Sequence, residues 1–172
     1  IANKTKEITS IVEVAEKLKD FKEIKKHALP KYFKGKLRGY QISGYNWLNF
    51  LREYGFNGCL ADDMGLGKTV QALALLQKVK ENNALGTSLL IVPVSTIPNW
   101  ENEIERFTPL LKHTRHSGIE RNKDLDYLNK FDLIIMSYHT MRNDIELLHK
   151  MELDYIILDE SQYIKNSTSQ SF

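Results

Sequence analysis

Residues 62–69, in the order Asp-Asp-Met-Gly-Leu-Gly-Lys-Thr, are the residue types that a phosphate-binding loop needs. Small residues let backbone N–H groups wrap phosphate oxygens, a lysine reaches the β- and γ-phosphates, and a Ser or Thr hydroxyl binds magnesium. Gly65, Gly67, Lys68 and Thr69 supply these groups at the required relative positions. The general pattern would have glycine, not aspartate, at position 62. A nucleotide-binding loop is the favoured interpretation, and a coincidental turn is the alternative.

Two adjacent acids, Asp159 and Glu160, follow the short apolar run 155–158 about ninety residues later. The run has the composition of a strand buried on both faces. Because open α/β sheets bind ligands at the carboxyl ends of their strands, we expect both acids to lie beside the glycine loop. Asp159 would hold Mg²⁺ through water, and Glu160 would orient and deprotonate an attacking water. A solvated acidic pair at a strand end is the alternative.

The composition is that of an ordinary soluble globular protein, with 42% hydrophobic and 27% charged residues in a chain of 172. This length favours one well-buried domain over two. No apolar run is long enough for a bilayer, so we expect no membrane partner and no secretion. Cys59 is the only cysteine, which fits a reducing compartment. The expected location is the cytoplasm or nucleoid of a bacterium, or a eukaryotic nucleus.

The net charge of +2 is distributed unevenly. Residues 1–36 contain ten lysines and five acids, so they carry +5 and the remaining residues carry −3. We therefore expect a basic helical extension with a linker over residues 1–36 and a catalytic lobe over residues 37–172. The basic segment could attract nucleic acid, or it could be the solvated face of a helix.

Short apolar runs alternate with helical patterns along most of the chain. We expect strands at residues 58–61, 89–92, 113–116, 133–136 and 155–158, with Cys59 buried in the first of them. We expect helices at residues 10–27, 41–53, 68–80, 98–107 and 140–149. Strands and helices that alternate in this way predict an α/β fold, with a mostly parallel sheet and helices on both faces.

Five separated motifs resemble, in order, those of the SWI/SNF-type ATPases, which are double-stranded-DNA translocases of helicase superfamily two. The first resembles the family's adenine-recognition motif, and the others resemble its motif I, motif Ia, serine-tyrosine motif and motif II. They lie at residues 37–48, 62–69, 89–100, 135–138 and 159–166. Motif I of this family typically lacks the first glycine, so the aspartate at position 62 fits the resemblance. The resemblance implies a RecA-like P-loop lobe.

The resemblance also implies that this lobe binds ATP and Mg²⁺. Gln41 would read the adenine edge, because its amide offers one donor and one acceptor. Lys68, Asp159 and Glu160 would be catalytic, and Thr69 and Asp159 would hold the magnesium ion. The residues implied in ATP binding are Arg38, Gln41, Met64, Gly65, Leu66, Gly67, Lys68 and Thr69.

Double-stranded DNA is the partner that the resemblance implies. Asn99, Trp100, Ser137 and Tyr138 fall in motifs that lie near the DNA backbone in the family, although Trp100 could equally pack in the core. Motif II departs from the family at two positions, with Ser161 for the common Ala and Gln162 for the usual His. We expect these two departures to change how ATP hydrolysis is coupled to DNA.

The family has a second RecA-like lobe, which supplies an arginine finger worth about 10³–10⁵ in rate in related phosphoryl transfer. We expect the 172 residues alone to bind nucleotide weakly and to hydrolyse it negligibly. Two other hypotheses of function remain open: a helicase lobe that acts on RNA or single strands, and a non-catalytic nucleotide-dependent interaction module. The sequence leaves open whether the target is naked DNA, a nucleoprotein or a polymerase.

Overall fold

The computed structural model describes residues 21–63 and 65–164. The chain divides into two compact units, Ile1–Leu29 with Lys36–Leu75, and Pro30–Gly35 with Leu76–Phe172. Helix α3 (Lys68–Glu81) contains the boundary between them. Residues 31–36 were expected to be a linker, but Pro30–Gly35 belongs to the second unit. There the backbone N–H groups of Lys31 and Tyr32 each donate to the Glu81 carboxylate at 2.8 Å.

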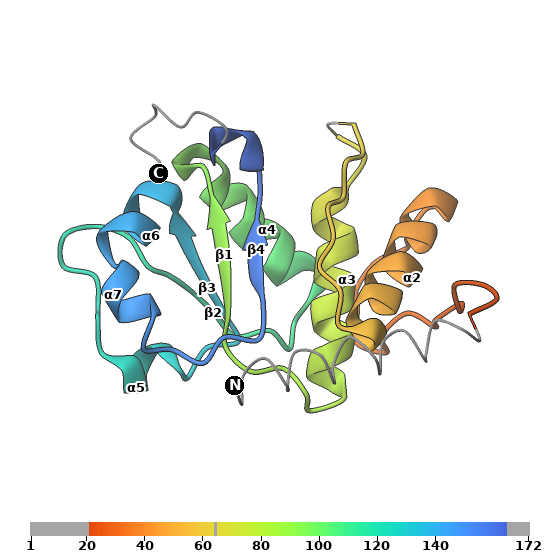
Figure 1. The fold of residues 1–172 in the computed structure, drawn as a ribbon, viewed down its shortest axis with the longest axis horizontal. Coiled ribbons are helices and arrows are strands. Elements are labelled where there is room, and N and C mark those ends of the chain that lie inside the picture. Colours follow the sequence, from red (N-terminus) through yellow and green to blue (C-terminus); the bar gives the residue numbers. More distant parts are fainter. Residues whose placement is uncertain (1–20, 64, 165–172) are drawn as a thin grey trace, which may run out of the picture. The chain divides into compact units, whose positions relative to one another are not determined.

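The second unit is built on a four-stranded, all-parallel sheet with the order β2-β3-β1-β4 (Figure 1). The strands are β1 (Ser88–Val92), β2 (His113–Arg115), β3 (Leu133–Ser137) and β4 (Ile156–Leu158). Every residue of β1 and β3 is buried, and each of these strands has a neighbouring strand on both sides. The predicted parallel α/β sheet is therefore confirmed.

Helices pack against this sheet in two groups. They are α4 (Ile97–Phe107), α5 (Leu125–Leu128), α6 (Tyr138–Asn143) and α7 (Ile145–Leu148), with 3-10 turns η1 (Val94–Thr96) and η2 (Ser161–Ile164). Leu89, Ile91, Ile134 and Met136 form a core cluster with side chains of the α5–α7 region. Because side chains alternate along a strand, the intervening residues of β1 and β3 face the other side, and α4 also contacts β3. The helix expected at 140–149 is two helices, which meet at Asp144.

Strand β4 is more exposed than the sequence suggested. Ile156 and Leu158 are 61% and 43% exposed, although the run 155–158 was expected to be buried on both faces. Among the described residues β4 pairs only with β1, so it is an edge strand, and one side of it has no neighbouring strand to cover it.

Helix α2 (Gly39–Tyr54) is the main element of the first unit besides the start of α3. Tyr45 is fully buried, and its hydroxyl donates to the Ala28 carbonyl at 3.0 Å. Asn46 is also buried, and its side-chain oxygen accepts from the His27 N–H at 2.8 Å. These polar contacts attach the segment before α2 to the helix.

Two predicted elements of the first unit differ in the structure. Residues 58–61 form no strand, and Cys59 is exposed. This segment lies against α2, where a Cβ at Gly58 would come within 2.2 Å of the Leu51 side chain. Most of the helix predicted at 10–27 lies outside the described residues, and residues 21–27 are not helical. In the described part of the chain no helix is long and apolar enough to cross a membrane.

Candidate nucleotide site

The glycine loop lies in the first unit, where two of its residues have left-handed backbone conformations. Gly65 has φ +81° and Gly67 has φ +75°. Side chains rarely adopt this region, so glycine is required at both positions. At Gly67 a Cβ would also meet the Gln41 amide nitrogen at 2.5 Å. Met64, the remaining loop residue expected to bind nucleotide, lies outside the described residues.

Lys68 folds back onto the loop that precedes it. Its Nζ donates to the backbone carbonyls of Asp62 at 2.7 Å and Asp63 at 3.1 Å. Lys68 is the first residue of α3 and Thr69 the second, so both stand at a helix N-terminus, where partial positive charge and free N–H groups favour an anion. The Lys68 ammonium, which now donates to carbonyls of the loop, could donate to phosphate oxygens in their place.

Gln41 connects the start of α2 to the glycine loop. Its Oε1 accepts from the Arg38 N–H at 2.8 Å, and its Nε2 donates to the Leu66 carbonyl at 3.1 Å. The side chain is only 8% exposed. The residue expected to read adenine thus uses both ends of its amide within the protein, and it fixes the position of the loop relative to α2.

Gln71, which the sequence reasoning missed, supports the loop from α3. It is fully buried, and its Nε2 lies 3.4 Å from both the Asp62 carboxylate and the Gly67 carbonyl. Its Oε1 would lie 1.8 Å from a Cβ at Gly44, so Gly44 lets α2 and α3 approach closely here. A glutamine one turn after the P-loop lysine, paired with a glycine in the preceding helix, is the signal that could have identified this contact.

Asp159 stands at the carboxyl end of β4 in the second unit, and its polar atoms are engaged. Its N–H donates to the Ile91 carbonyl at 3.0 Å, which extends the pairing with β1. Oδ2 accepts from the Trp100 indole N–H at 2.8 Å, and Oδ1 from the Glu160 N–H at 3.0 Å. The Tyr138 hydroxyl donates to the Asp159 carbonyl at 2.7 Å. The carboxyl ends of β1, β3 and β4 therefore meet around this residue.

Glu160 has a left-handed backbone, with φ +51°, which is uncommon for a residue that carries a side chain. Such outliers cluster at functional sites, because the surrounding structure must hold them in place. The Gln162 side-chain amide donates to the Glu160 carboxylate, so the glutamine that replaces the family's usual His contacts the expected general base.

Burial raises the pKa of Tyr138 to about 12, and the negative charges of Asp159 and Glu160 act in the same direction. Burial likewise raises the pKa of Glu103 on α4, and the charge of Asp159 adds to this effect. Both groups are partly shielded from water, and both lie near the carboxylate of Asp159.

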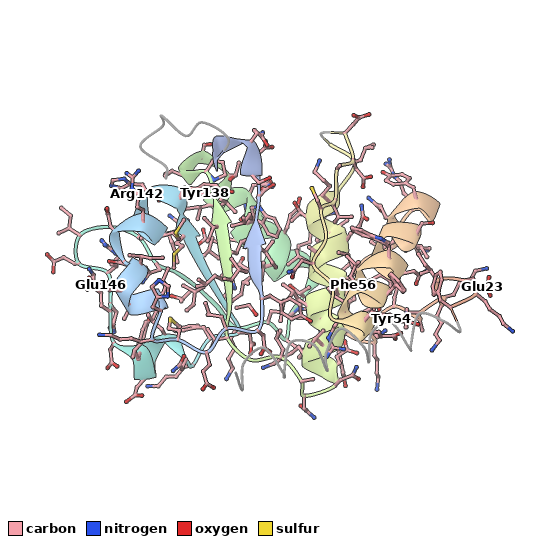
Figure 2. The ribbon with its side chains drawn as sticks, viewed as in Figure 1. Glu23, Tyr54, Phe56, Tyr138, Arg142 and Glu146 are labelled. Carbon is pink, nitrogen blue, oxygen red and sulfur yellow. The ribbon has the colours of Figure 1, made fainter. Side chains whose placement is uncertain are left out.

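The four residues expected near DNA take different positions. Trp100 and Tyr138 are 3% and 9% exposed, and both hydrogen-bond to Asp159, so their polar groups point into the protein. The Ser137 hydroxyl caps α6 by accepting from the Thr140 N–H at 3.1 Å. Only Asn99 is exposed. Figure 2 shows Tyr138 and Arg142 on α6.

A model of the SNF2-related domain matches residues 40–172. The chain belongs to this family. It resembles the first RecA-like lobe of SNF2-type ATPases within helicase superfamily two, as the five motifs suggested. The glycine loop belongs to one compact unit and Asp159 to the other. That they act on one nucleotide therefore remains a prediction.

Individual relatives agree with this assignment. The chain is 41% identical over 172 residues to YwqA of Bacillus subtilis, a candidate ATP-dependent helicase/translocase, with 97% of the chain and 18% of YwqA aligned. It is 40% identical over 152 residues to the chromatin-remodeling ATPase INO80 of Homo sapiens, with 81% of the chain and 10% of INO80 aligned. The solved SWI2/SNF2 ATPase core domain of Sulfolobus solfataricus matches with a TM-score of 0.74 and 38% identity.

The chain spans a small part of these relatives, and it covers 30% of the Sulfolobus structure while 87% of the chain is matched. The named relatives are ATP-dependent enzymes, so nucleotide use is a property of this family. The oxygen donors present, the Thr69 hydroxyl and the Asp159 carboxylate, are of the type that Mg²⁺ prefers. Each unit by itself thus presents a group that magnesium could bind.

Proposed function

We propose that this chain is the ATP-binding first lobe of a double-stranded-DNA-dependent ATPase that translocates along the duplex. The observation that carries the proposal is the glycine loop, where Gly65 and Gly67 have left-handed φ and the Lys68 ammonium rests on two loop carbonyls. A loop of this type at a helix N-terminus is suited to a nucleotide phosphate.

ATP binding would draw the Lys68 ammonium from the Asp62 and Asp63 carbonyls onto the β- and γ-phosphates. Thr69 and Asp159 would hold Mg²⁺, which neutralises the charge that develops on the phosphates when it is bound. Glu160 would accept a proton from the attacking water. Its left-handed backbone and its bond from Gln162 would fix the direction of that carboxylate.

A second RecA-like lobe of the same protein would complete the catalytic site by supplying an arginine finger. Such a residue contributes about 10³–10⁵ in rate in related phosphoryl transfer. The 172 residues by themselves should bind ATP weakly and turn it over at a small fraction of the rate of the full-length protein.

Duplex DNA would bind along the carboxyl edge of the sheet, where α4 and α6 begin. Asn99 and His139 are exposed there, and Arg142 on α6 adds a positive charge that suits a phosphate backbone. INO80 is named a chromatin-remodeling ATPase, and this supports a nucleoprotein as the natural target. A polymerase is the other candidate partner. We propose a cytoplasmic, nucleoid-associated location if the protein is bacterial and a nuclear one if it is eukaryotic.

The test is ATP turnover by the full-length protein with no nucleic acid, single-stranded DNA, double-stranded DNA or double-stranded RNA. We expect double-stranded DNA alone to stimulate turnover strongly, and we expect Glu160→Gln to abolish turnover while ATP still binds. Stimulation by RNA or single strands would move the protein to another helicase branch. Bound ATP with no turnover under any condition would identify a non-catalytic interaction module.

A further inference from the structure

Asp159 is held from two helices that begin at neighbouring strands of the sheet. From α4, the Trp100 indole N–H donates to Oδ2 at 2.8 Å. From α6, the Tyr138 hydroxyl donates to the backbone carbonyl at 2.7 Å. One contact orients the carboxylate and the other fixes the backbone that carries it.

The Trp100 contact is suited to setting the direction of the Asp159 carboxylate. The indole is 3% exposed, and N–H is its only polar group, so losing the bond would leave a buried donor without an acceptor. A bond to an ionised acceptor is also stronger than one between neutral groups. The Glu160 N–H, at 3.0 Å, fixes the other oxygen, Oδ1. Each oxygen keeps a lone pair for the water shell of a cation.

We propose that Trp100 is a positioning residue for magnesium: its indole N–H holds the Asp159 carboxylate in the orientation that binds the ion, and Tyr138 supports the same residue through its backbone. This inference rests on the proposed function, since it assumes that Asp159 holds the magnesium of bound ATP. It assigns Trp100 a role inside the lobe in place of direct contact with DNA.

The experiment uses the full-length protein and the fluorescent nucleotide mant-ATP, with Mg²⁺ titrated at a fixed nucleotide concentration. Loss of an outer-shell partner typically costs about 10–100-fold in metal affinity. Trp100→Phe should therefore raise the Mg²⁺ concentration for half-maximal binding about tenfold. Tyr138→Phe should raise it less, because its bond reaches the backbone rather than the carboxylate. Binding of mant-ATP measured in EDTA should be unchanged in both variants.

Tyr127→Phe is the matched control, because Tyr127 lies on α5 and packs edge-to-face against Phe131, with their ring centroids 5.2 Å apart. Its Mg²⁺ dependence should equal that of the wild type. If Trp100→Phe fails to fold, 3-benzothienylalanine at position 100 replaces the N–H by sulfur and keeps the size of the ring. In an Asp159→Asn background, either change at position 100 should have no further effect on the Mg²⁺ dependence.

Two results separate this inference from the proposed function. If the wild type binds mant-ATP with Mg²⁺ dependence and the folded Trp100 variants show the same half-saturation, the positioning role is overturned and the proposed function stands. If the wild type binds no mant-ATP at all, both are overturned.

Discussion

At the scale of single residues, Gly65 and Gly67 have similar backbone conformations but different surroundings. A Cβ at Gly65 would have no atom within 4 Å, whereas a Cβ at Gly67 would meet Gln41 at 2.5 Å. Gly65→Ala therefore carries only left-handed strain, about 1–2 kcal/mol. Gly67→Ala carries the same strain and also displaces the Gln41 amide. We expect Gly67→Ala to lose more affinity for mant-ATP than Gly65→Ala, as measured by fluorescence titration.

Gly118→Ala is the control for this comparison. Its φ is +84°, a Cβ there would also have no atom within 4 Å, and the residue lies outside the glycine loop. It should lose stability but keep its affinity for mant-ATP. Equal losses of affinity in Gly65→Ala and Gly67→Ala would show that the contact with Gln41 does not shape the loop.

Tyr138 makes the free energy of unfolding depend on pH in the alkaline range. Its pKa is raised to about 12 in the folded protein, against about 10 for an unfolded tyrosine. The folded state holds the proton more tightly, so this contribution to stability is complete below about pH 10 and is lost as the pH rises through 12. Tyr138→Phe should flatten the fall in the free energy of unfolding over that interval, measured by urea unfolding at stepped pH. Parallel curves for wild type and variant would contradict this.

At the scale of elements, the close approach of α2 and α3 depends on Gly44. A Cβ at that position would lie 1.8 Å from the Gln71 side-chain oxygen. Alanine favours a helix over glycine by about 0.5–1 kcal/mol, but overpacking a core costs about 1–3 kcal/mol. We expect Gly44→Ala to lower the free energy of unfolding despite its better helix propensity, measured by urea denaturation.

Gly39→Ala is the matched control in the same helix, because a Cβ there would have no atom within 4 Å. It should change the free energy of unfolding by no more than about 0.5 kcal/mol. In a Gln71→Ala background the penalty of Gly44→Ala should disappear. If the penalty persists there, the clash with Gln71 is not its cause.

Asp144 joins the end of β2 to the junction of α6 and α7. Its carboxylate is 1% exposed and pairs with three side chains: His116 at 2.9 Å, Arg121 at 2.5 Å and Lys123 at 2.7 Å. The hydrogen bonds from Arg121 chiefly hold the pKa of Asp144 well below its usual range, so its contribution is complete above about pH 4 and is lost as the pH falls. Asp144→Ala should cost about 3–5 kcal/mol at neutral pH, since it leaves the buried His116 and the largely buried Arg121 without their partner.

Thermal and urea unfolding at pH 7 and below pH 4 would measure this contribution. The difference in the free energy of unfolding between the wild type and Asp144→Ala should be smaller below pH 4 than at pH 7. Asp126→Ala, at an exposed position in α5, should change stability by less than about 0.5 kcal/mol at both pH values. A difference that is the same at both pH values would show that the charge of Asp144 is not what stabilises the junction.

Most elements of the described chain could be predicted from the sequence, because their apolar residues recur with a strand or helix period. Strands β1 and β3 and helices α3 and α4 begin and end within one or two residues of expectation, because their apolar runs are buried in the core. The run 58–61 was as long as the runs that became β1 and β3, but in the structure it forms no strand, and its sequence did not show that no strand pairs with it. The break at Asp144 was missed because ion pairs made by distant residues hold that junction together.

At the scale of the whole molecule, the sequence predicts a type of site, whereas the hydrogen bonds around Asp159 are visible only in the structure. Residue types and spacing indicated Lys68, Thr69, Asp159 and Glu160, because phosphate and magnesium chemistry demands those groups. The bonds of Trp100 and Tyr138 to Asp159 could not be predicted, since they join residues 59 and 21 positions apart in the chain. The spacing of motifs carries no information on which side chains turn inward.

The most direct test of the central claim is translocation on duplex DNA by the full-length protein. We would measure ATP-dependent displacement of a triplex-forming oligonucleotide from a duplex, together with strand separation of a forked duplex of the same sequence. We expect the protein to displace the oligonucleotide when ATP is present and to leave the forked strands paired. The Glu160→Gln variant should displace no oligonucleotide and separate no strands. Separation of the forked strands, or no displacement despite DNA-stimulated ATP turnover, would contradict this claim.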